Sequence, residues 1–176
     1  CNHLVEYTDS RVGNFAYVDV GGGSTEISLL HDGVLAESHS FNIGTLRMLG
    51  GAVSEQELMN MRQMLEEYAR EFPATKIIGS GGNINRLFRL ARLKGPQREL
   101  PVERLQELYD TLQALTVVQR MEQFKLKEDR ADVIVPAAEI FLTVVEALGS
   151  KSIIVPNISL ADSITDGIWR EMQMKG

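Results

Sequence analysis

The sequence lacks several features that would assign it to common functional classes. It has one cysteine among 176 residues, which excludes an internal disulfide and fits a reducing, cytoplasmic setting. No apolar run approaches the roughly 20 residues needed to cross a bilayer, so no membrane partner is expected. The net charge of −6 argues against a nucleic-acid partner, since nucleic-acid binding usually requires a basic face. A polyanion would therefore have to bind at a local site.

The composition predicts one folded domain over residues 1–176. Hydrophobic residues make up 44% and charged residues 24%, as in ordinary globular proteins. There is no repeat, linker or low-complexity segment. The sequence starts at Cys1, with neither an initiating methionine nor a signal peptide, so we expect it to be part of a longer protein.

The first third of the chain predicts a β-meander followed by a helix. Strands are expected at residues 15–20, 25–30 and 34–41, with a hairpin at Asp32-Gly33. A capping-box pattern at Ser54 predicts a helix start. That helix should end before Pro73.

The remainder alternates between strands and helices, which indicates an α/β domain with a mixed sheet. Further elements are expected at residues 76–78 (strand), 84–93 (helix), 101–115 (helix), 117–124 (helix), 131–148 (buried helix), 152–155 (strand) and 160–172 (helix).

The most informative segment is the run Val18-Asp19-Val20-Gly21-Gly22-Gly23-Ser24-Thr25-Glu26. Glycines let the backbone turn sharply, and successive N–H groups in such a turn form a concave nest for an anion. Asp19 and Glu26 supply the oxygen ligands that Mg²⁺ or Mn²⁺ prefers. A triple-glycine turn is also compatible with a purely structural reversal. The nest hypothesis predicts that Gly22 takes a positive φ, which a β-branched residue cannot adopt.

A second glycine-rich turn, Gly79-Ser80-Gly81-Gly82-Asn83, follows a predicted strand and leads into a predicted helix. Asn83 is a favourable N-cap residue, and the start of a helix attracts anions. The turn lacks the lysine of a Walker A motif and the third glycine of a dinucleotide fingerprint. It predicts a second wall of the same phosphate site, although an ordinary strand-to-helix turn is the simpler interpretation.

Basic residues follow the second turn at helical spacing. Arg86, Arg89 and Arg92 share one stripe, and Lys94 comes next. They fit either a surface that steers a polyphosphate or an ordinary solvated helix face.

These motifs together resemble the exopolyphosphatase and guanosine pentaphosphate phosphohydrolase (Ppx/GppA) family. The resemblance rests on the two glycine turns, on Asn42-Ile43-Gly44-Thr45-Leu46-Arg47 and on Arg130-Ala131-Asp132-Val133-Ile134-Val135-Pro136. It extends over about residues 14–173. The segment Leu160–Gly167 departs from the family pattern, because it lacks the family's arginine and glutamate.

The resemblance implies a ribonuclease H-like lobe of the actin, Hsp70 and sugar-kinase superfamily, with helices flanking a mixed sheet. It implies the second of two lobes, with the water-activating base in a first lobe that this chain lacks. The isolated chain should then fold, be inactive, and self-associate, as in a homodimer, through its uncovered face.

The implied reaction is metal-assisted hydrolysis of a terminal phosphoanhydride of polyphosphate or guanosine pentaphosphate. Asp19 and Glu26 are the expected catalytic residues and metal ligands, with Mg²⁺ or Mn²⁺ as cofactor. The expected phosphate-binding residues are Gly21, Gly22, Gly23, Ser24, Thr25, Gly81, Gly82 and Arg47. Two alternatives stay open: a nucleotide-binding kinase or ATPase lobe, and a non-catalytic sensor of polyphosphate or guanosine tetraphosphate.

Overall fold

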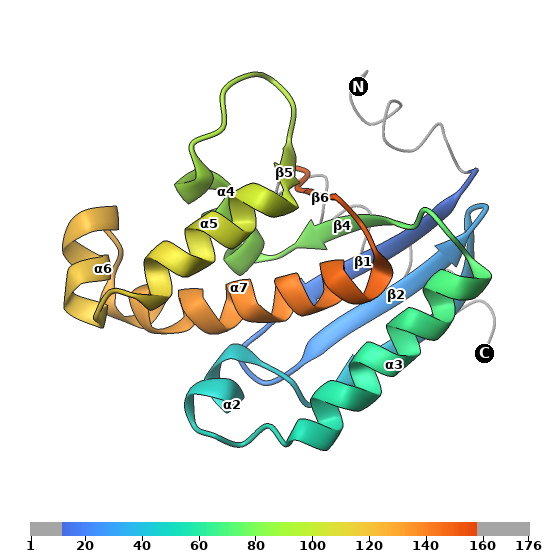
Figure 1. Cartoon of the computed structure of the whole chain (residues 1–176), viewed down its shortest axis with the longest axis horizontal. Helices are drawn as coiled ribbons and strands as arrows, with labels where there is room; N and C mark the ends of the chain where they lie inside the picture. Colours follow the sequence, from blue (N-terminus) through green and yellow to red (C-terminus); the bar gives the residue numbers. More distant parts are fainter. Residues whose placement is uncertain (1–11, 158–176) are drawn as a thin grey trace.

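The computed structural model describes residues 12–157 and contains a six-stranded sheet in the order β3-β2-β1-β4-β6-β5 (Figure 1). The strands are β1 (Asn14–Val20), β2 (Thr25–His31), β3 (Val34–Phe41), β4 (Lys76–Ser80), β5 (Glu99–Pro101) and β6 (Ser152–Ile154). β1 pairs antiparallel with β2 and parallel with β4, so the predicted mixed sheet is confirmed.

Helices α3 and α7 run side by side across one face of the sheet (Figure 1). The helices are α2 (Thr45–Leu49), α3 (Glu55–Glu71), α4 (Gly82–Ala91), α5 (Val102–Gln113), α6 (Val117–Phe124) and α7 (Glu128–Leu148). Alternate residues of β1, namely Ala16, Val18 and Val20, are buried in the core beneath these helices. Because side chains alternate along a strand, Tyr17 and Asp19 lie on the other face.

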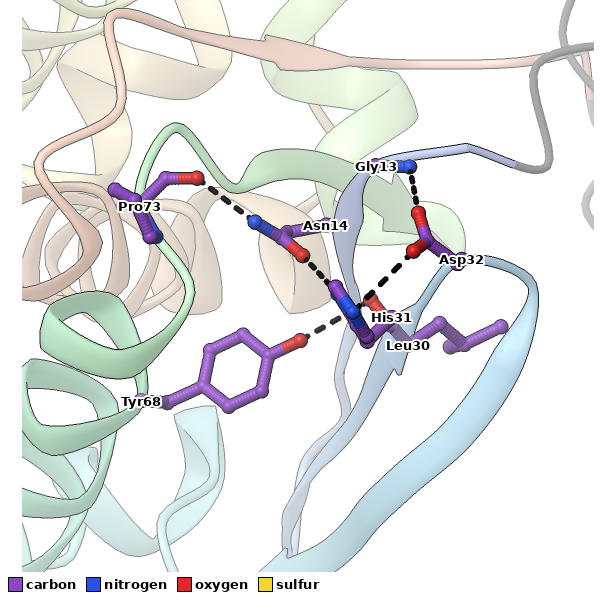
Figure 2. A network of polar contacts seen from close by, with 7 residues as sticks. All are labelled: Gly13, Asn14, Leu30, His31, Asp32, Tyr68 and Pro73. Atoms are coloured by element: carbon purple, nitrogen blue, oxygen red, sulfur yellow. Dashed lines mark hydrogen bonds and ion pairs between the residues drawn. The ribbon is translucent and has the colours of Figure 1, made fainter.

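The predicted hairpin between β2 and β3 is confirmed. Asp32 and Gly33 have φ values of 46° and 77°, the two positive values that a type I′ turn requires. Figure 2 shows how this end of the sheet is tied to the end of α3: the Tyr68 hydroxyl donates to the Leu30 carbonyl at 3.1 Å. His31 bridges Asn14, at 2.6 Å, and Asp32, at 3.3 Å.

The helix signals were mostly correct. Ser54 and Glu57 form the predicted capping box at the start of α3. The buried helix α7 ends at Gly149, which has a φ of 64°. It starts at Glu128 rather than Ala131, because two acidic residues occupy its first turn and favour the positive end of the helix dipole.

Two short elements, α2 and β5, have no counterpart in the sequence predictions. Each is stabilised by partners distant in the chain: α2 by the first glycine turn, and β5 by pairing with β6. The helix predicted at 160–172 lies outside the described residues. Within residues 12–157, no helix is long and apolar enough to cross a membrane.

Candidate active site

Asp19 is flanked by polar residues on both neighbouring strands. Glu26 is its antiparallel partner on β2, and Ser80 is its parallel partner on β4. Residues paired in register project on the same face, so β1 and β2 present two carboxylates side by side. Like charges directly opposite each other destabilise a sheet, so this pair needs a compensating ligand or a functional reason.

Two serine hydroxyls hold the Glu26 carboxylate. The hydroxyls of Ser24 and Ser40 donate to the same oxygen, Oε1, at 2.9 and 2.7 Å. No hydrogen-bond partner of Oε2 is found among residues 12–157. Glu26 is exposed, on the face of β2 opposite the buried Thr25, Ile27 and Leu29. Its carboxylate is therefore oriented by the protein and keeps one oxygen for an external ligand.

The Asp19 carboxylate lies against the second glycine turn. A Cβ atom placed on Gly81 would be 2.7 Å from Asp19 Oδ1. Burial of the carboxylate raises the pKa of Asp19, a hydrogen bond with Ser80 lowers it, and the charge of Glu26 raises it. The net direction is upward from the ordinary value of 3.8. A cation between the two carboxylates would remove the repulsion that contributes to this increase.

The first glycine turn is attached to helix α2 through its carbonyl groups. The carbonyls of Gly21 and Gly22 accept hydrogen bonds from the N–H groups of Thr45 and Leu46, both at 3.0 Å. The positive φ predicted for Gly22 is wrong, because residues 21–23 have no positive φ. Glycine is required here by close approach: a Cβ on Gly44 would lie 2.3 Å from the Gly22 carbonyl oxygen.

The N–H groups of this turn are partly available. Gly21 donates to the Ser24 carbonyl at 2.9 Å and so closes the turn. Within the described part of the chain, the N–H groups of Gly22 and Gly23 have no acceptor. The predicted nest is therefore reduced to the tip of the turn.

Two predicted phosphate contacts have other partners in the structure. Thr25 is fully buried, and its hydroxyl donates to the Ile43 carbonyl at 2.6 Å, so its side chain faces the core rather than a ligand. Arg47 donates from Nε to the Gly23 carbonyl at 2.7 Å. Arg47 is exposed, so its contact both holds the turn in place and brings a positive charge to its tip.

The second glycine turn opens helix α4 in a conformation that favours glycine. Gly81 is the N-cap residue, with φ 93° and ψ 175°. The prediction that Asn83 caps the helix is wrong: its side chain donates instead to the Val20 carbonyl at 2.8 Å and joins the two turns. No acceptor for the N–H groups of Gly82 and Asn83 occurs within residues 12–157. These groups and the helix dipole make the start of α4 attractive to an anion.

A basic groove continues along α4 away from the glycine turns. Its cationic residues come from α4 and its C-cap, from the segment joining α6 to α7, and from the first turn of α7: Arg86, Arg89, Arg92, Lys125, Lys127 and Arg130. The Nη1 atom of Arg86 is buried and has no hydrogen-bond partner within the part of the chain that the structure describes. Burial, and then the nearby charges of Arg130 and Arg89, lower the pKa of Arg86. The sequence indicated the α4 arginines but not the α6–α7 residues, which are more than thirty positions away.

The carboxylates alone do not enclose a metal ion. Across residues 12–157, no group of three or more His, Cys, Asp or Glu side chains is close enough to share an ion. A cation at Asp19 and Glu26 would take its remaining ligands from water or from a bound phosphate. Hard divalent cations, Mg²⁺ in particular, commonly bind this way.

Comparisons with known proteins identify relatives of this chain. A guanosine-5′-triphosphate,3′-diphosphate pyrophosphatase from Aeromonas hydrophila is 22% identical, over 93% of this chain and 36% of that protein. The PPX-GPPA enzyme from Aquifex aeolicus superposes with a TM-score of 0.70 and 25% identity, over 92% of this chain and 59% of that one. An exopolyphosphatase from Cytophaga hutchinsonii, 19% identical, shares the fold with a TM-score of 0.67, over 94% of this chain and 62% of that one.

The structural matches confirm the predicted lobe of the actin-like superfamily. The chain spans about a third of the length of the curated relatives that it matches. The model of the Ppx/GppA phosphatase family matches residues 4–170, which is nearly the whole sequence. The chain therefore belongs to the Ppx/GppA phosphatase family.

Proposed function

We propose that this chain is the second lobe of a hydrolase that removes the terminal phosphate of inorganic polyphosphate or guanosine pentaphosphate. One observation carries the proposal: Asp19 and Glu26 lie directly opposite each other on adjacent strands, between two glycine turns whose tips offer N–H groups with no acceptor among residues 12–157. Carboxylates beside backbone donors are the groups needed to hold a metal–phosphate complex.

In this proposal the two turns bind phosphate oxygens from opposite sides. Gly22 and Gly23 offer N–H groups on one side, and Gly82 and Asn83 offer them on the other. Donors that are already in position contribute to catalysis because they need no reorganisation when charge develops on the phosphoryl group. Ser24 and Thr25 act through the turn itself, Ser24 by holding Glu26 and Thr25 by its hydrogen bond to Ile43.

Asp19 and Glu26 fit a magnesium or manganese ion. Their paired position provides oxygen ligands, among them Oε2 of Glu26, which has no hydrogen-bond partner among residues 12–157. Burial, and secondarily the charge of Glu26, raise the pKa of Asp19, and a cation between the two carboxylates would offset that repulsion. When bound, such an ion neutralises phosphate charge and lowers the pKa of a coordinated water. The protein's own contribution is to fix both carboxylates, through Ser24 and Ser40 for Glu26 and through Ser80 for Asp19.

The basic groove supports a polyanionic substrate. It carries six cationic side chains on a protein whose net charge is −6, with Asp129 as an acidic lining residue. The buried Nη1 of Arg86 has no acceptor among the described residues 12–157, and an anion's oxygen would provide one. We assign this groove to the part of the substrate beyond the phosphate being removed.

Turnover also requires groups outside this chain. The proteins that this chain resembles are longer: the match covers 36% of the Aeromonas protein and 59% of the Aquifex chain. We place the base that activates water on a first lobe facing the two turns. The 176-residue chain should therefore bind substrate but not hydrolyse it, because loss of a base alone costs about 10²- to 10⁴-fold in rate.

The test is phosphate release by a protein that contains both lobes, with Mg²⁺ and either polyphosphate or guanosine pentaphosphate. We expect release from at least one substrate, and we expect Glu26→Gln to reduce it by about 10²-fold or more. Glu37→Gln is the matched control, because Glu37 is also an exposed carboxylate of the meander but pairs with His39. Binding without turnover would favour the sensor alternative, and normal turnover in Glu26→Gln would overturn the site.

A further inference from the structure

Arg98, just before β5, connects three parts of the structure. Its Nε donates to the Val155 carbonyl at 2.6 Å, and its Nη2 donates to Asn85 Oδ1 at 3.3 Å. The guanidinium also lies 4.8 Å from the centre of the Phe88 ring on α4. One side chain thus links the strand edge to the first turns of the helix that follows the second glycine turn.

Asn85 extends this connection to the glycine turn. It is only 8% exposed, and its Nδ2 donates to the Gly81 carbonyl at 2.8 Å. An amide side chain has one accepting and one donating end, and arginine can only donate. The contact with Arg98 therefore fixes the orientation of Asn85, with its NH₂ group directed at Gly81.

The Gly81 carbonyl determines where the next N–H group points. The peptide unit is planar and trans, so its C=O and N–H bonds point in opposite directions. With the Gly81 carbonyl held towards the helix by Asn85, the N–H of Gly82 points away from the helix, out of its N-terminus. Gly81 has a φ of 93° and no side-chain cap, and its carbonyl also accepts the backbone N–H of Asn85 at 3.4 Å. The Asn85 side chain, at 2.8 Å, is the shorter of these two contacts.

We propose that Arg98 is a positioning residue for the anion site: acting through Asn85 and the Gly81 carbonyl, it holds the Gly82 N–H in its binding direction. This inference rests on the proposed function only in taking the start of α4 as the phosphate-binding wall. The hydrogen-bonded route itself is independent of substrate, so it can be tested separately.

The first experiment compares two arginines, Arg98 and Arg104, that contact α4 near opposite ends, at Asn85 and at Ala91. Arg98→Met keeps an unbranched side chain over Phe88 but removes the guanidinium. Arg104→Met is the matched control, because Arg104 donates to the Ala91 carbonyl at 3.0 Å and to Glu107, away from the glycine turn. With calorimetry of tripolyphosphate binding in Mg²⁺, we expect about tenfold weaker binding for Arg98→Met and no change for Arg104→Met. Equal affinities for the two variants would overturn the proposal.

A double-mutant cycle then separates positioning from general stabilisation. Asn85→Leu preserves the size of the buried side chain but removes both of its hydrogen bonds. If Arg98 acts through Asn85, adding Arg98→Met to Asn85→Leu should not weaken binding further. Additive losses would show that Arg98 acts by another route and would contradict the proposal.

Amide NMR of the substrate-free chain distinguishes the two possible failures. Arg98→Met should shift the Gly82 N–H resonance and speed hydrogen exchange of the Asn85 side-chain amide, whereas Arg104→Met should change neither. If these changes occur but the wild-type chain binds no tripolyphosphate, the connection is supported and the proposed function fails. If Gly82 and Asn85 are unchanged in Arg98→Met, the connection itself is disproved.

Discussion

The two glycine turns use the same residue type for different physical reasons. At the first turn, glycine allows the backbones of Gly22 and Gly44 to approach so closely that a Cβ on Gly44 would lie 2.3 Å from an oxygen. At the second, Gly81 has a φ of 93° and also leaves room for the Asp19 carboxylate. A glycine motif in a sequence therefore does not reveal whether space or conformation is the requirement.

The turns also differ in whether they provide acceptors for the first N–H groups of the helix beside them. The carbonyls of the first turn accept the leading N–H groups of α2, so this helix start is already satisfied. The start of α4 has no side-chain cap, and its first N–H groups have no acceptor in the described chain. Anion binding by a helix terminus is thus expected at the second turn, while the first contributes the loop tip and Arg47.

The largest effect is expected for Gly81→Ala. The variant must adopt a backbone region that is essentially restricted to glycine, and its Cβ would overlap Asp19, so we expect a loss of about 3 kcal/mol in the free energy of unfolding. Gly82→Ala is the control, because a Cβ there meets nothing within 4 Å. Urea denaturation measures both. A Gly81→Ala variant as stable as Gly82→Ala would show that conformation is not the requirement at this turn.

Gly44→Ala tests the role of space at the first turn. The added methyl group would force α2 away from Gly22, and we expect a loss of about 2 kcal/mol. Gly50, at the other end of α2, offers a matched substitution, because a Cβ there would lie 3.4 Å from the Leu46 carbonyl oxygen, which is an ordinary van der Waals contact. Thermal unfolding of the two alanine variants should separate them clearly, and similar melting temperatures would argue against close packing of α2 on the turn.

Asp19→Asn should stabilise the fold while weakening metal binding. Because the pKa of Asp19 is raised, the folded state binds its proton more tightly than the unfolded state, and stability falls as pH rises from 3.8 through the folded pKa. Above that window the variant, which lacks the charge facing Glu26, should be more stable by up to about 1 kcal/mol. Unfolding measured from pH 3 to pH 7 provides the test. A less stable variant at pH 7 would mean that the Asp19 charge is already compensated within the chain.

The smallest effect is expected for Gly22→Ala. Its Cβ would lie 2.9 Å from Leu46 Cδ1, the end of a flexible side chain that is 62% exposed and can move aside. We expect a change within about 0.5 kcal/mol, close to that of Gly23→Ala, which meets open space. Chemical denaturation of both variants is sufficient. If Gly22→Ala, but not Gly23→Ala, lowered the free energy of unfolding by more than about 1 kcal/mol, the backbone conformation of the first turn would require glycine after all.

The sequence predicted the elements whose signals are local. An apolar run before the glycine turn predicted β1, the alternation of Ile27 and Leu29 with polar residues fitted β2, the capping box predicted the start of α3, and Asp32-Gly33 predicted the hairpin. It also placed Asp19 and Glu26 near each other, because two short strands on either side of a tight turn must pair.

Local sequence patterns could not predict the contacts between segments that are distant in the chain. The N-cap is Gly81 rather than the predicted Asn83, and the Asn83 side chain donates from Nδ2 to the Val20 carbonyl, sixty-three positions earlier. Thr25 shares the buried face of β2 with Ile27 and Leu29, but its hydrogen-bond acceptor, the Ile43 carbonyl, is brought near only by tertiary packing. The roles of Arg98 and of the α6–α7 cations likewise depend on segments that meet only in the folded chain.

The central claim is that Asp19 and Glu26 together form a divalent-cation site, and Mn²⁺ titration of the 176-residue chain tests it most directly. Wild type and Glu37→Gln should bind one Mn²⁺, detected by electron paramagnetic resonance, with tripolyphosphate strengthening the binding. Asp19→Asn and Glu26→Gln should each weaken it by about tenfold or more while unfolding cooperatively, as the wild type does. Equal Mn²⁺ affinity in all four proteins would contradict the assignment of this carboxylate pair.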